Sequence, residues 1–175
     1  MTGSEDESRT NTFEFRSPRL EDGADVHRLI RATEPLDLNS LYCYLIICDH
    51  FSDTSIVAMH AGRVVGFISA YVLPKRPDTL FIWQVAVDST MRRRGLAMKM
   101  AEGILARECA AGLRYIETTV SPSNTASSRF FETLASRLGT AITKDTYITE
   151  SMFGGETHEA ETLYRIGPFD TPKRA

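Results

Sequence analysis

The chain has 175 residues, which is enough for one domain with a hydrophobic core of its own. Hydrophobic residues make up 42% and charged residues 25%, a globular composition that excludes a wholly disordered or collagen-like chain. The net charge of −3 argues against a nucleic-acid partner, and no apolar run approaches the ~18 residues of a membrane-spanning helix. The polar, acidic start MTGSEDESRTNT lacks the apolar stretch of a secretory signal.

The three cysteines, Cys43, Cys48 and Cys109, have no CxxC spacing. This favours reduced structural thiols in a cytoplasmic protein over a disulfide framework or a zinc site. We therefore expect no metal.

The first half of the chain predicts two helices and a hairpin, after an N-terminal tail over residues 1–12. Alternation over 13–16 predicts a strand, and apolar residues at helical spacing over 22–31 predict a helix that ends before Pro35. A second short helix is expected over 40–49. Two β-rich runs, 55–60 and 63–73, flank Ala61-Gly62 and predict a hairpin, with a loop over 74–78.

The second half alternates strands and helices. The nearly continuous apolar run 80–87 predicts a strand covered on both faces, and helical periodicity covers 96–109, ending at Gly112. A strand over 115–120 and a helix from Asn124 to Leu138 follow, and Gly139 is expected to end that helix. We expect a short strand over 140–143, an irregular loop over 147–159 and a strand over 162–166. The order indicates one α/β domain with a mixed sheet over 13–169, and a tail over 170–175.

The sharpest signal is the turn between the strand 80–87 and the helix that follows, Arg92-Arg93-Arg94-Gly95-Leu96-Ala97. Small residues at such a turn let backbone N–H groups point at one spot, and the helix N-terminus adds about half a positive charge. Together with the arginines this favours a phosphate-binding loop. It is neither a GxxxxGK[ST] nor a GxGxxG motif, and on spacing alone a plain turn with a solvated basic cluster explains it equally well.

In this context Arg92-x-x-Gly95-x-Ala97 resembles the acetyl-CoA signature [QR]-x-x-G-x-[GA] of the GNAT N-acetyltransferases. Asn124, with Phe131 seven residues later, resembles the second motif of that family, and the order of elements matches over 13–167. More specific segments resemble the L-2,4-diaminobutyrate acetyltransferases of ectoine biosynthesis. They are 35–45 (PLDLNSLYCYL), 77–79, 83–87, 117–119 and 164–169.

The resemblance implies a mostly antiparallel, twisted GNAT sheet whose strands 80–87 and 115–120 splay apart to admit acetyl-CoA as co-substrate. The Val85 N–H would face the thioester oxygen and stabilise an oxyanion. The implied cofactor-binding residues are Val85, Ala86, Val87, Arg92, Arg93, Arg94, Gly95, Leu96, Ala97, Met98, Asn124 and Phe131. Phe131 stands where many members of the family carry a tyrosine, so Tyr42, Tyr44 or water would protonate the leaving thiolate.

The implied reaction is acetyl transfer to the 4-amino group of L-2,4-diaminobutyrate. An alkylamine is mostly protonated at neutral pH, so the site needs a carboxylate and aromatic walls. The implied substrate-binding residues are Asp37, Asn39, Tyr42, Trp83, Gln84, Thr118, Glu156, His158 and Glu159, and Tyr42, Tyr44 and Glu159 are also candidate catalytic groups.

Each of these residues has a plainer interpretation. Without the resemblance, Asp37 is better explained as a helix cap, the tyrosines and Trp83 as core, and His158 as part of a solvated loop. The alternative functions are acetylation of another amine (a polyamine, an aminoglycoside or a protein N-terminus) and a non-catalytic acetyl-CoA-binding module. A homodimer is expected, with the C-terminal strand as the edge that could pair, and no nucleic acid or membrane is expected as a partner.

Overall fold

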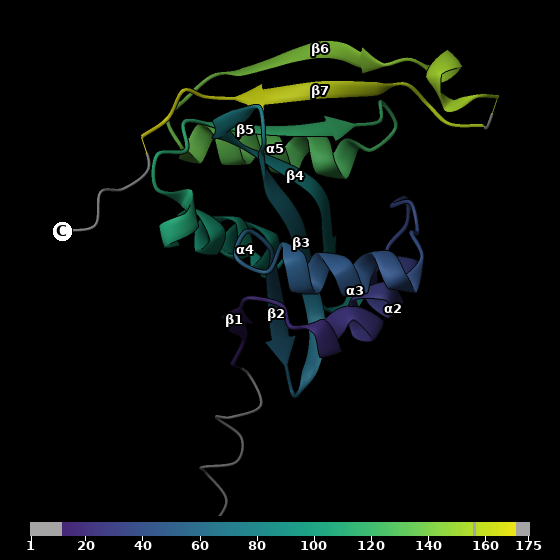
Figure 1. Ribbon diagram of the computed structural model, residues 1–175, viewed down its shortest axis with the longest axis vertical. Helices are drawn as coiled ribbons and strands as arrows, with labels where there is room; N and C mark the ends of the chain where they lie inside the picture. Colours follow the sequence, from purple (N-terminus) through teal and green to yellow (C-terminus); the bar gives the residue numbers. More distant parts are fainter. Residues whose placement is uncertain (1–11, 156, 171–175) are drawn as a thin grey trace, which may run out of the picture. The chain divides into compact units, whose positions relative to one another are not determined.

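The computed structural model describes residues 12–155 and 157–170, so the predicted tails lie outside the described residues apart from residues 12 and 170. Seven strands form one hydrogen-bonded sheet in the order β1-β2-β3-β4-β5-β7-β6 (Figure 1). β4 and β5 are parallel, whereas β1–β2, β2–β3, β5–β7 and β6–β7 are antiparallel. The mixed, mostly antiparallel sheet that the sequence predicts is therefore confirmed.

The described chain divides into two compact units. Among the described residues, one comprises 12–69 with Gln84–Leu105, and the other comprises Ala70–Trp83 with 106–155 and 157–170. The long strands β3 (Arg63–Leu73) and β4 (Arg76–Val87) contribute residues to both units.

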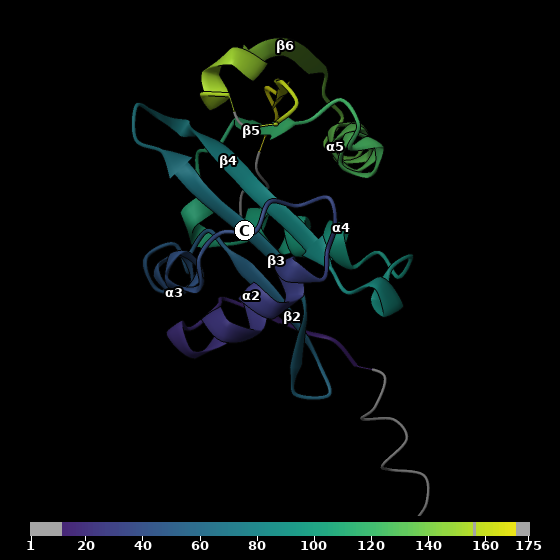
Figure 2. The same cartoon turned by 90° about the vertical axis from the view of Figure 1, so that its right-hand side faces the viewer.

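In the first unit, helices lie on both faces of the strands. The elements are β1 (Glu14–Arg16), α2 (Gly23–Arg31), α3 (Leu41–His50), β2 (Ile56–His60) and α4 (Leu96–Leu105), with short 3₁₀ turns at Leu20–Asp22 and Ser89–Met91. Figures 1 and 2 show α2 and α3 on one face of β2 and β3, and α4 on the other. Val26, Ile30, Ile47, Val57 and Phe67 are buried between the two helices and the strands.

Gly66 of β3 faces the end of a side chain from α4. A Cβ atom built on Gly66 of β3 would lie 2.9 Å from the Met100 side chain of α4, closer than real Cβ atoms approach. A side chain at Gly66 would therefore require the end of the flexible Met100 side chain to shift.

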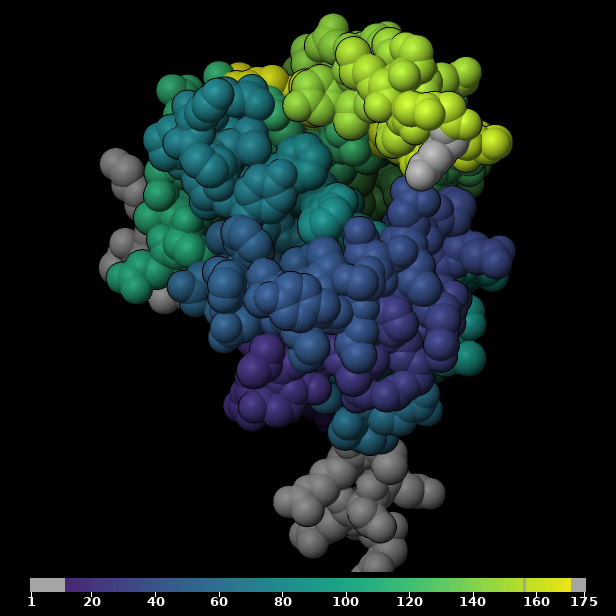
Figure 3. All heavy atoms as spheres, turned by 45° about the vertical axis from the view of Figure 1, so that its right-hand side comes forward, coloured from purple at the N-terminus to yellow at the C-terminus, as the bar shows by residue number. Residues whose placement is uncertain are grey.

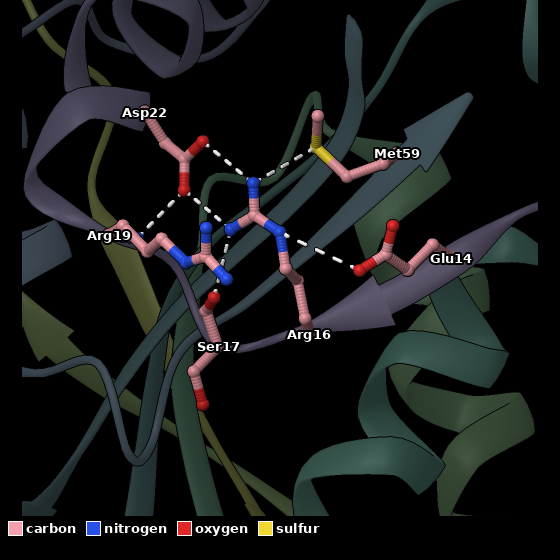
Figure 4. A network of polar contacts seen from close by, with 6 residues as sticks. All are labelled: Glu14, Arg16, Ser17, Arg19, Asp22 and Met59. Atoms are coloured by element: carbon pink, nitrogen blue, oxygen red, sulfur yellow. Dashed lines mark hydrogen bonds and ion pairs between the residues drawn. The ribbon is translucent and has the colours of Figure 1, made fainter. Parts of the chain in front are cut away.

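A polar network fastens β1 to the turn before α2 (Figure 4). The Arg16 guanidinium donates to both carboxylate oxygens of Asp22, at 2.7 and 2.9 Å, and the Arg19 N–H donates to the same carboxylate at 2.7 Å. Burial raises the pKa of Asp22, but the hydrogen bonds and charges of Arg16 and Arg19 outweigh it and hold this pKa below its usual range. The pair is therefore ionised at neutral pH.

The second unit combines antiparallel strands with one long helix. Its elements are β5 (Tyr115–Val120), α5 (Thr125–Arg137), β6 (Ile142–Ile148) and β7 (Glu161–Ile166), with short 3₁₀ turns at Glu108–Ala110 and Glu150–Phe153. The Asn124 side chain accepts a hydrogen bond from the Ser127 N–H at 3.1 Å and caps α5. Gly139, at φ +64°, follows the last helical residues. Both predicted ends of this helix are confirmed.

Three predicted boundaries are wrong. β4 begins at Arg76 rather than Leu80, because the loop shrinks to the turn at 74–75. Pro77 is tolerated there, since pairing with β5 begins only at Thr79. α4 ends at Leu105 instead of reaching residue 109, because Arg107 has an extended backbone, with ψ 162°.

The remaining boundary error concerns the sheet edge. β6 runs over Ile142–Ile148, so it is longer than the strand predicted over 140–143 and takes the first residues of the predicted loop. β7 lies between β5 and β6 and is not an edge strand, so the predicted edge for dimer pairing is wrong. None of the helices in the described part of the chain has the length and apolarity needed to cross a membrane.

Candidate functional site

The loop between β4 and α4 has the backbone of an anion-binding turn. Arg93 and Gly95 both have positive φ, 63° and 72°, and a Cβ on Gly95 would meet no protein atom within 4 Å. The first helical hydrogen bond runs from Lys99 N–H to the Gly95 carbonyl at 3.0 Å. The N–H groups of residues 96–98 precede that bond and have no partner within the helix. An anionic group fits this helix N-terminus.

Two of the three loop arginines contact other groups of the protein, although all three side chains are exposed. The Arg92 Nε donates to the Val87 carbonyl at 3.4 Å, and the Arg94 guanidinium lies 5.9 Å from the centre of the Phe13 ring. A cation–π contact of this kind restrains a cation without neutralising it. The loop therefore presents positive charge next to its backbone N–H groups.

The end of β4 directs backbone donors away from β3. Gln84 N–H donates to the Ser69 hydroxyl at 3.1 Å and Asp88 N–H to the Val65 carbonyl at 2.9 Å, both on the β3 side. Successive N–H groups of a strand point to opposite sides in the plane of the sheet. The N–H groups of Val85 and Val87 therefore point away from β3. The parallel register of β4 with β5 ends at Phe81 and Glu117, before either valine.

The segment before α3 is hydrogen-bonded to β4. Tyr44 of α3 is fully buried, and its hydroxyl donates to Gln84 Oε1 and accepts from the Asn39 N–H, each at 3.2 Å. Gln84 Nε2 donates to the Asp37 carbonyl at 2.8 Å. These bonds bring together four predicted site residues, 37, 39, 44 and 84.

Asp37 is not the cap of α3. The Ser40 side chain accepts from the Cys43 N–H at 3.2 Å and occupies the N-cap position. The cap interpretation of Asp37 is therefore wrong, and its exposed carboxylate lies in the irregular segment before the helix. The α3 segment, blue in Figure 3, lies at the surface.

Tyr42 and Tyr44 face opposite ways. Tyr42 is 71% exposed and Tyr44 is 0% exposed, so only Tyr42 has a solvent-accessible hydroxyl. Trp83, the other predicted aromatic wall, is 42% exposed.

In the second unit, Glu159 of the predicted irregular loop and Glu161 of β7 are hydrogen-bonded to the turn before α5. Glu159 accepts from the Ser123 N–H at 3.0 Å, and Glu161 accepts from the Ser121 hydroxyl at 2.7 Å. The His158 ring stacks on Phe153 with 3.9 Å between ring centres. The predicted site residue Glu156 lies outside the described residues.

The other predicted residues of this unit are mostly buried. Phe131 is 2% exposed and meets Phe130 edge to face, with 4.9 Å between ring centres. Thr118 is 2% exposed on β5. The Asn124 side-chain oxygen is occupied by the cap of α5. Across residues 12–155 and 157–170, no three histidine, cysteine or acidic side chains gather as a metal-binding group.

A family model described as the acetyltransferase (GNAT) family matches residues 24–135, which is more than half of the chain. This chain belongs to the GNAT acetyltransferase family. Within the family, it is 47% identical to the L-2,4-diaminobutyric acid acetyltransferase of Bordetella parapertussis, over 91% of this chain and 87% of that protein. It is 39% identical to the enzyme of the same name from Marinococcus halophilus, over 97% of this chain and 96% of that protein.

Solved structures agree with these relatives. The diaminobutyrate acetyltransferase EctA from Paenibacillus lautus, in complex with its substrate L-2,4-diaminobutyric acid and coenzyme A, matches with a TM-score of 0.88 and 46% identity. The match covers 93% of this GNAT chain and 99% of that one. Ard1 from Thermoplasma volcanium, at 20% identity and a TM-score of 0.71, shares the fold. The GNAT fold predicted from the Arg92–Ala97 motif is thus confirmed.

One buried charge in this GNAT chain lies outside the site residues that the sequence predicts. Glu117 of β5 is 1% exposed, and its carboxylate accepts from Arg76 at 2.7 and 2.6 Å and from Arg165. Arg165 also lies over the Tyr115 ring, 3.8 Å from its centre. The partners are 41 and 48 residues away in sequence, so no local spacing reveals the cluster. The available signal was an acid inside a strand, which is rarely buried unless it is paired.

Proposed function

We propose that this protein is an acetyl-CoA-dependent N-acetyltransferase that converts L-2,4-diaminobutyrate to N4-acetyl-L-2,4-diaminobutyrate in ectoine biosynthesis. The observation that carries the proposal is the match to the EctA structure, with a TM-score of 0.88 at 46% identity over 93% of this chain. That protein holds diaminobutyric acid and coenzyme A, and relatives named for the same activity cover most of this chain.

The β4–α4 loop would hold the pyrophosphate of acetyl-CoA. The N–H groups of residues 96–98 are unused within the helix, and Arg92 and Arg94 add positive charge beside them. Acetyl-CoA supplies the acetyl group as a thioester. The Val85 N–H, which points away from β3, would donate to the thioester oxygen and stabilise the negative charge that develops there.

The acceptor amine needs both an anchor and a route for its proton. Asp37, exposed next to the Gln84 side chain, would attract the ammonium group, and Trp83 and Tyr42 would provide aromatic surface. The ammonium group first loses one proton to the proton acceptor, and the neutral amine then attacks the thioester carbon: the C–N bond forms, the C–S bond breaks, the nitrogen loses a second proton and the thiolate gains one. We propose Glu159 or water as the proton acceptor. We propose Tyr42 rather than Tyr44 as the proton donor to the thiolate, because the Tyr44 hydroxyl is buried.

The test is incubation of the purified protein with acetyl-CoA, diaminobutyrate and a thiol reagent, followed by mass spectrometry of the product. We expect release of free coenzyme A and acetylation at the 4-amino group. A higher kcat/KM for a polyamine or an aminoglycoside would replace diaminobutyrate with another amine. Binding of acetyl-CoA with no thiol release for any amine would identify a non-catalytic module.

Three finer points belong to the same proposal. A homodimer is supported by the exposed apolar side chains of Leu38 and Leu41, and light scattering tests it. We propose a reducing, cytoplasmic setting, because Cys43, Cys48 and Cys109 form no disulfide. A role in osmoprotection rests on the proposed place in ectoine biosynthesis. Growth of a deletion strain at high salt, with and without supplied ectoine, tests the osmoprotective role.

A further inference from the structure

We propose that Tyr44 and Gln84 act together as a positioning pair, which fixes the acceptor-binding segment 37–39 to β4 and thereby orients Asp37 toward the amine. The inference rests on the proposed function and assigns Tyr44 a role other than catalysis. It concerns residues that meet within one compact unit of the chain.

The pair uses the polar groups of both side chains. Gln84 accepts from the Tyr44 hydroxyl at 3.2 Å and donates to the Asp37 carbonyl at 2.8 Å. The Tyr44 hydroxyl also accepts from the Asn39 N–H at 3.2 Å. Tyr44 is 0% exposed and Gln84 is 5% exposed, so water cannot readily replace either partner.

The segment that the pair holds has no regular structure of its own. Residues 37–39 belong to neither a helix nor a strand, and α3 begins only at Leu41. Both ends of the segment are bonded to the pair, Asp37 through its carbonyl and Asn39 through its N–H. The position of the Asp37 carboxylate therefore depends on two buried side chains that need not touch the substrate.

Gln84, the residue of β4 to which the segment is bonded, lies next to a group with a proposed role in catalysis. Gln84 directly precedes Val85, whose N–H is the proposed oxyanion donor. The segment that holds the amine is thus tied one residue away from the group that would polarise the thioester. Since acyl transfer is sensitive to the distance between nucleophile and carbonyl carbon, a fixed relation between these two groups favours reaction.

If Tyr44 and Gln84 had a purely structural role, a different result would be expected. Two satisfied polar side chains in a core would contribute only to stability, and their loss would lower the melting temperature without selecting one substrate. If Tyr44 were instead the proton donor, its loss would lower kcat and leave the diaminobutyrate KM unchanged.

The experiment uses Gln84→Met and Tyr44→Phe, which remove hydrogen-bonding groups and change the side-chain volumes little. We expect the KM for diaminobutyrate to rise roughly tenfold or more in both, and the KM for acetyl-CoA to stay almost unchanged. Tyr164→Phe is the matched control, because Tyr164 is 7% exposed and its hydroxyl lies 3.1 Å from that of Ser128. It should lower the melting temperature and leave both KM values alone.

A double variant shows whether the pair acts through Asp37. If Gln84 works by placing that carboxylate, Gln84→Met should add little to the effect of Asp37→Asn on the diaminobutyrate KM. Fully additive effects would overturn the inference. So would an unchanged diaminobutyrate KM in both single variants, equal rises in both KM values, or a fall in kcat alone for Tyr44→Phe.

Assays of the wild-type protein distinguish a failure of this inference from a failure of the proposed function on which it rests. A wild type that releases no coenzyme A with diaminobutyrate refutes the proposed function. A wild type that turns over normally, with variants that keep its diaminobutyrate KM, refutes the positioning pair alone. Because Tyr44→Phe only removes a hydroxyl, it keeps the test decisive if Gln84→Met fails to fold.

Discussion

Replacing Asp22 with asparagine should lower the melting temperature much more than the same change at Asp25. The Asp22 carboxylate accepts from Arg16 and from the Arg19 N–H, and the Arg16 and Asp22 side chains are only 20% and 11% exposed. Asparagine cannot balance the Arg16 charge. Breaking a fully buried pair costs about 3–5 kcal/mol, and partial exposure reduces this to about 2–3 kcal/mol. A chain of this size loses about 2–4 °C per kcal/mol, so the expected fall is about 4–12 °C.

Asp25→Asn is the matched control. Asp25 also pairs with an arginine, Arg28, but these side chains are 37% and 59% exposed. An exposed pair is worth about 0–1 kcal/mol, so the fall should not exceed about 4 °C. Differential scanning calorimetry of both variants makes the comparison, and equal falls would refute the reasoning from burial.

The pH dependence adds a second check. Since the pKa of Asp22 is lower in the folded than in the unfolded protein, its contribution is complete above the unfolded pKa of about 3.9 and is lost as the pH falls through the folded value. The difference between wild type and Asp22→Asn should therefore shrink on acidification below about pH 4. A difference that grows in acid would contradict the sign of the shift.

Four further outcomes are expected. Asp37→Asn should raise the diaminobutyrate KM by roughly ten- to a hundredfold and spare the acetyl-CoA KM, because it removes a charge-assisted hydrogen bond; unchanged kinetics would remove Asp37 from the acceptor site. Gly95→Val should weaken coenzyme A binding in calorimetry, because φ is +72° there and the side chain would occupy the space of the pyrophosphate. Phe131→Leu should keep a near-normal kcat and Phe131→Tyr should slow the enzyme by no more than a few fold, whereas a collapse of kcat in Phe131→Leu would show a role beyond packing. Burial raises the pKa of Cys48 to about 12, so mass spectrometry should find it unmodified after iodoacetamide treatment of the native protein at pH 8, and rapid alkylation would show that it is accessible.

The fold was largely predictable where local chemistry decides the structure. Asn124 and Gly139 mark both ends of α5, and Ala61-Gly62 marks the hairpin, because a helix cap and residues with positive φ depend on a few adjacent positions. The predicted strand boundaries were wrong where pairing with a distant strand determines where a strand begins. Pro77 suggested a loop, yet β4 includes it, because its neighbour β5 begins pairing only at Thr79.

The candidate site was predictable as segments and less so as individual roles. Family resemblance alone makes Tyr42 and Tyr44 equivalent candidates, although residues two apart on a helix face different directions. That rule already separates the exposed Tyr42 from the buried Tyr44. The bonds from Gln84 and the cluster around Glu117 lay beyond any sequence rule, because their partners are 40 or more residues away and only the tertiary fold brings them together.

Trp83 gives the protein a built-in optical reporter. It is the one tryptophan in the sequence, so selective excitation of indole reports on this position of β4 alone. Trp83 is 42% exposed and directly precedes Gln84 in the chain, so its emission should respond to a change in the water around this part of the strand. Titration of diaminobutyrate into the unlabelled wild-type protein can therefore be followed by fluorescence, with no dye, tag or substitution near the residues under study.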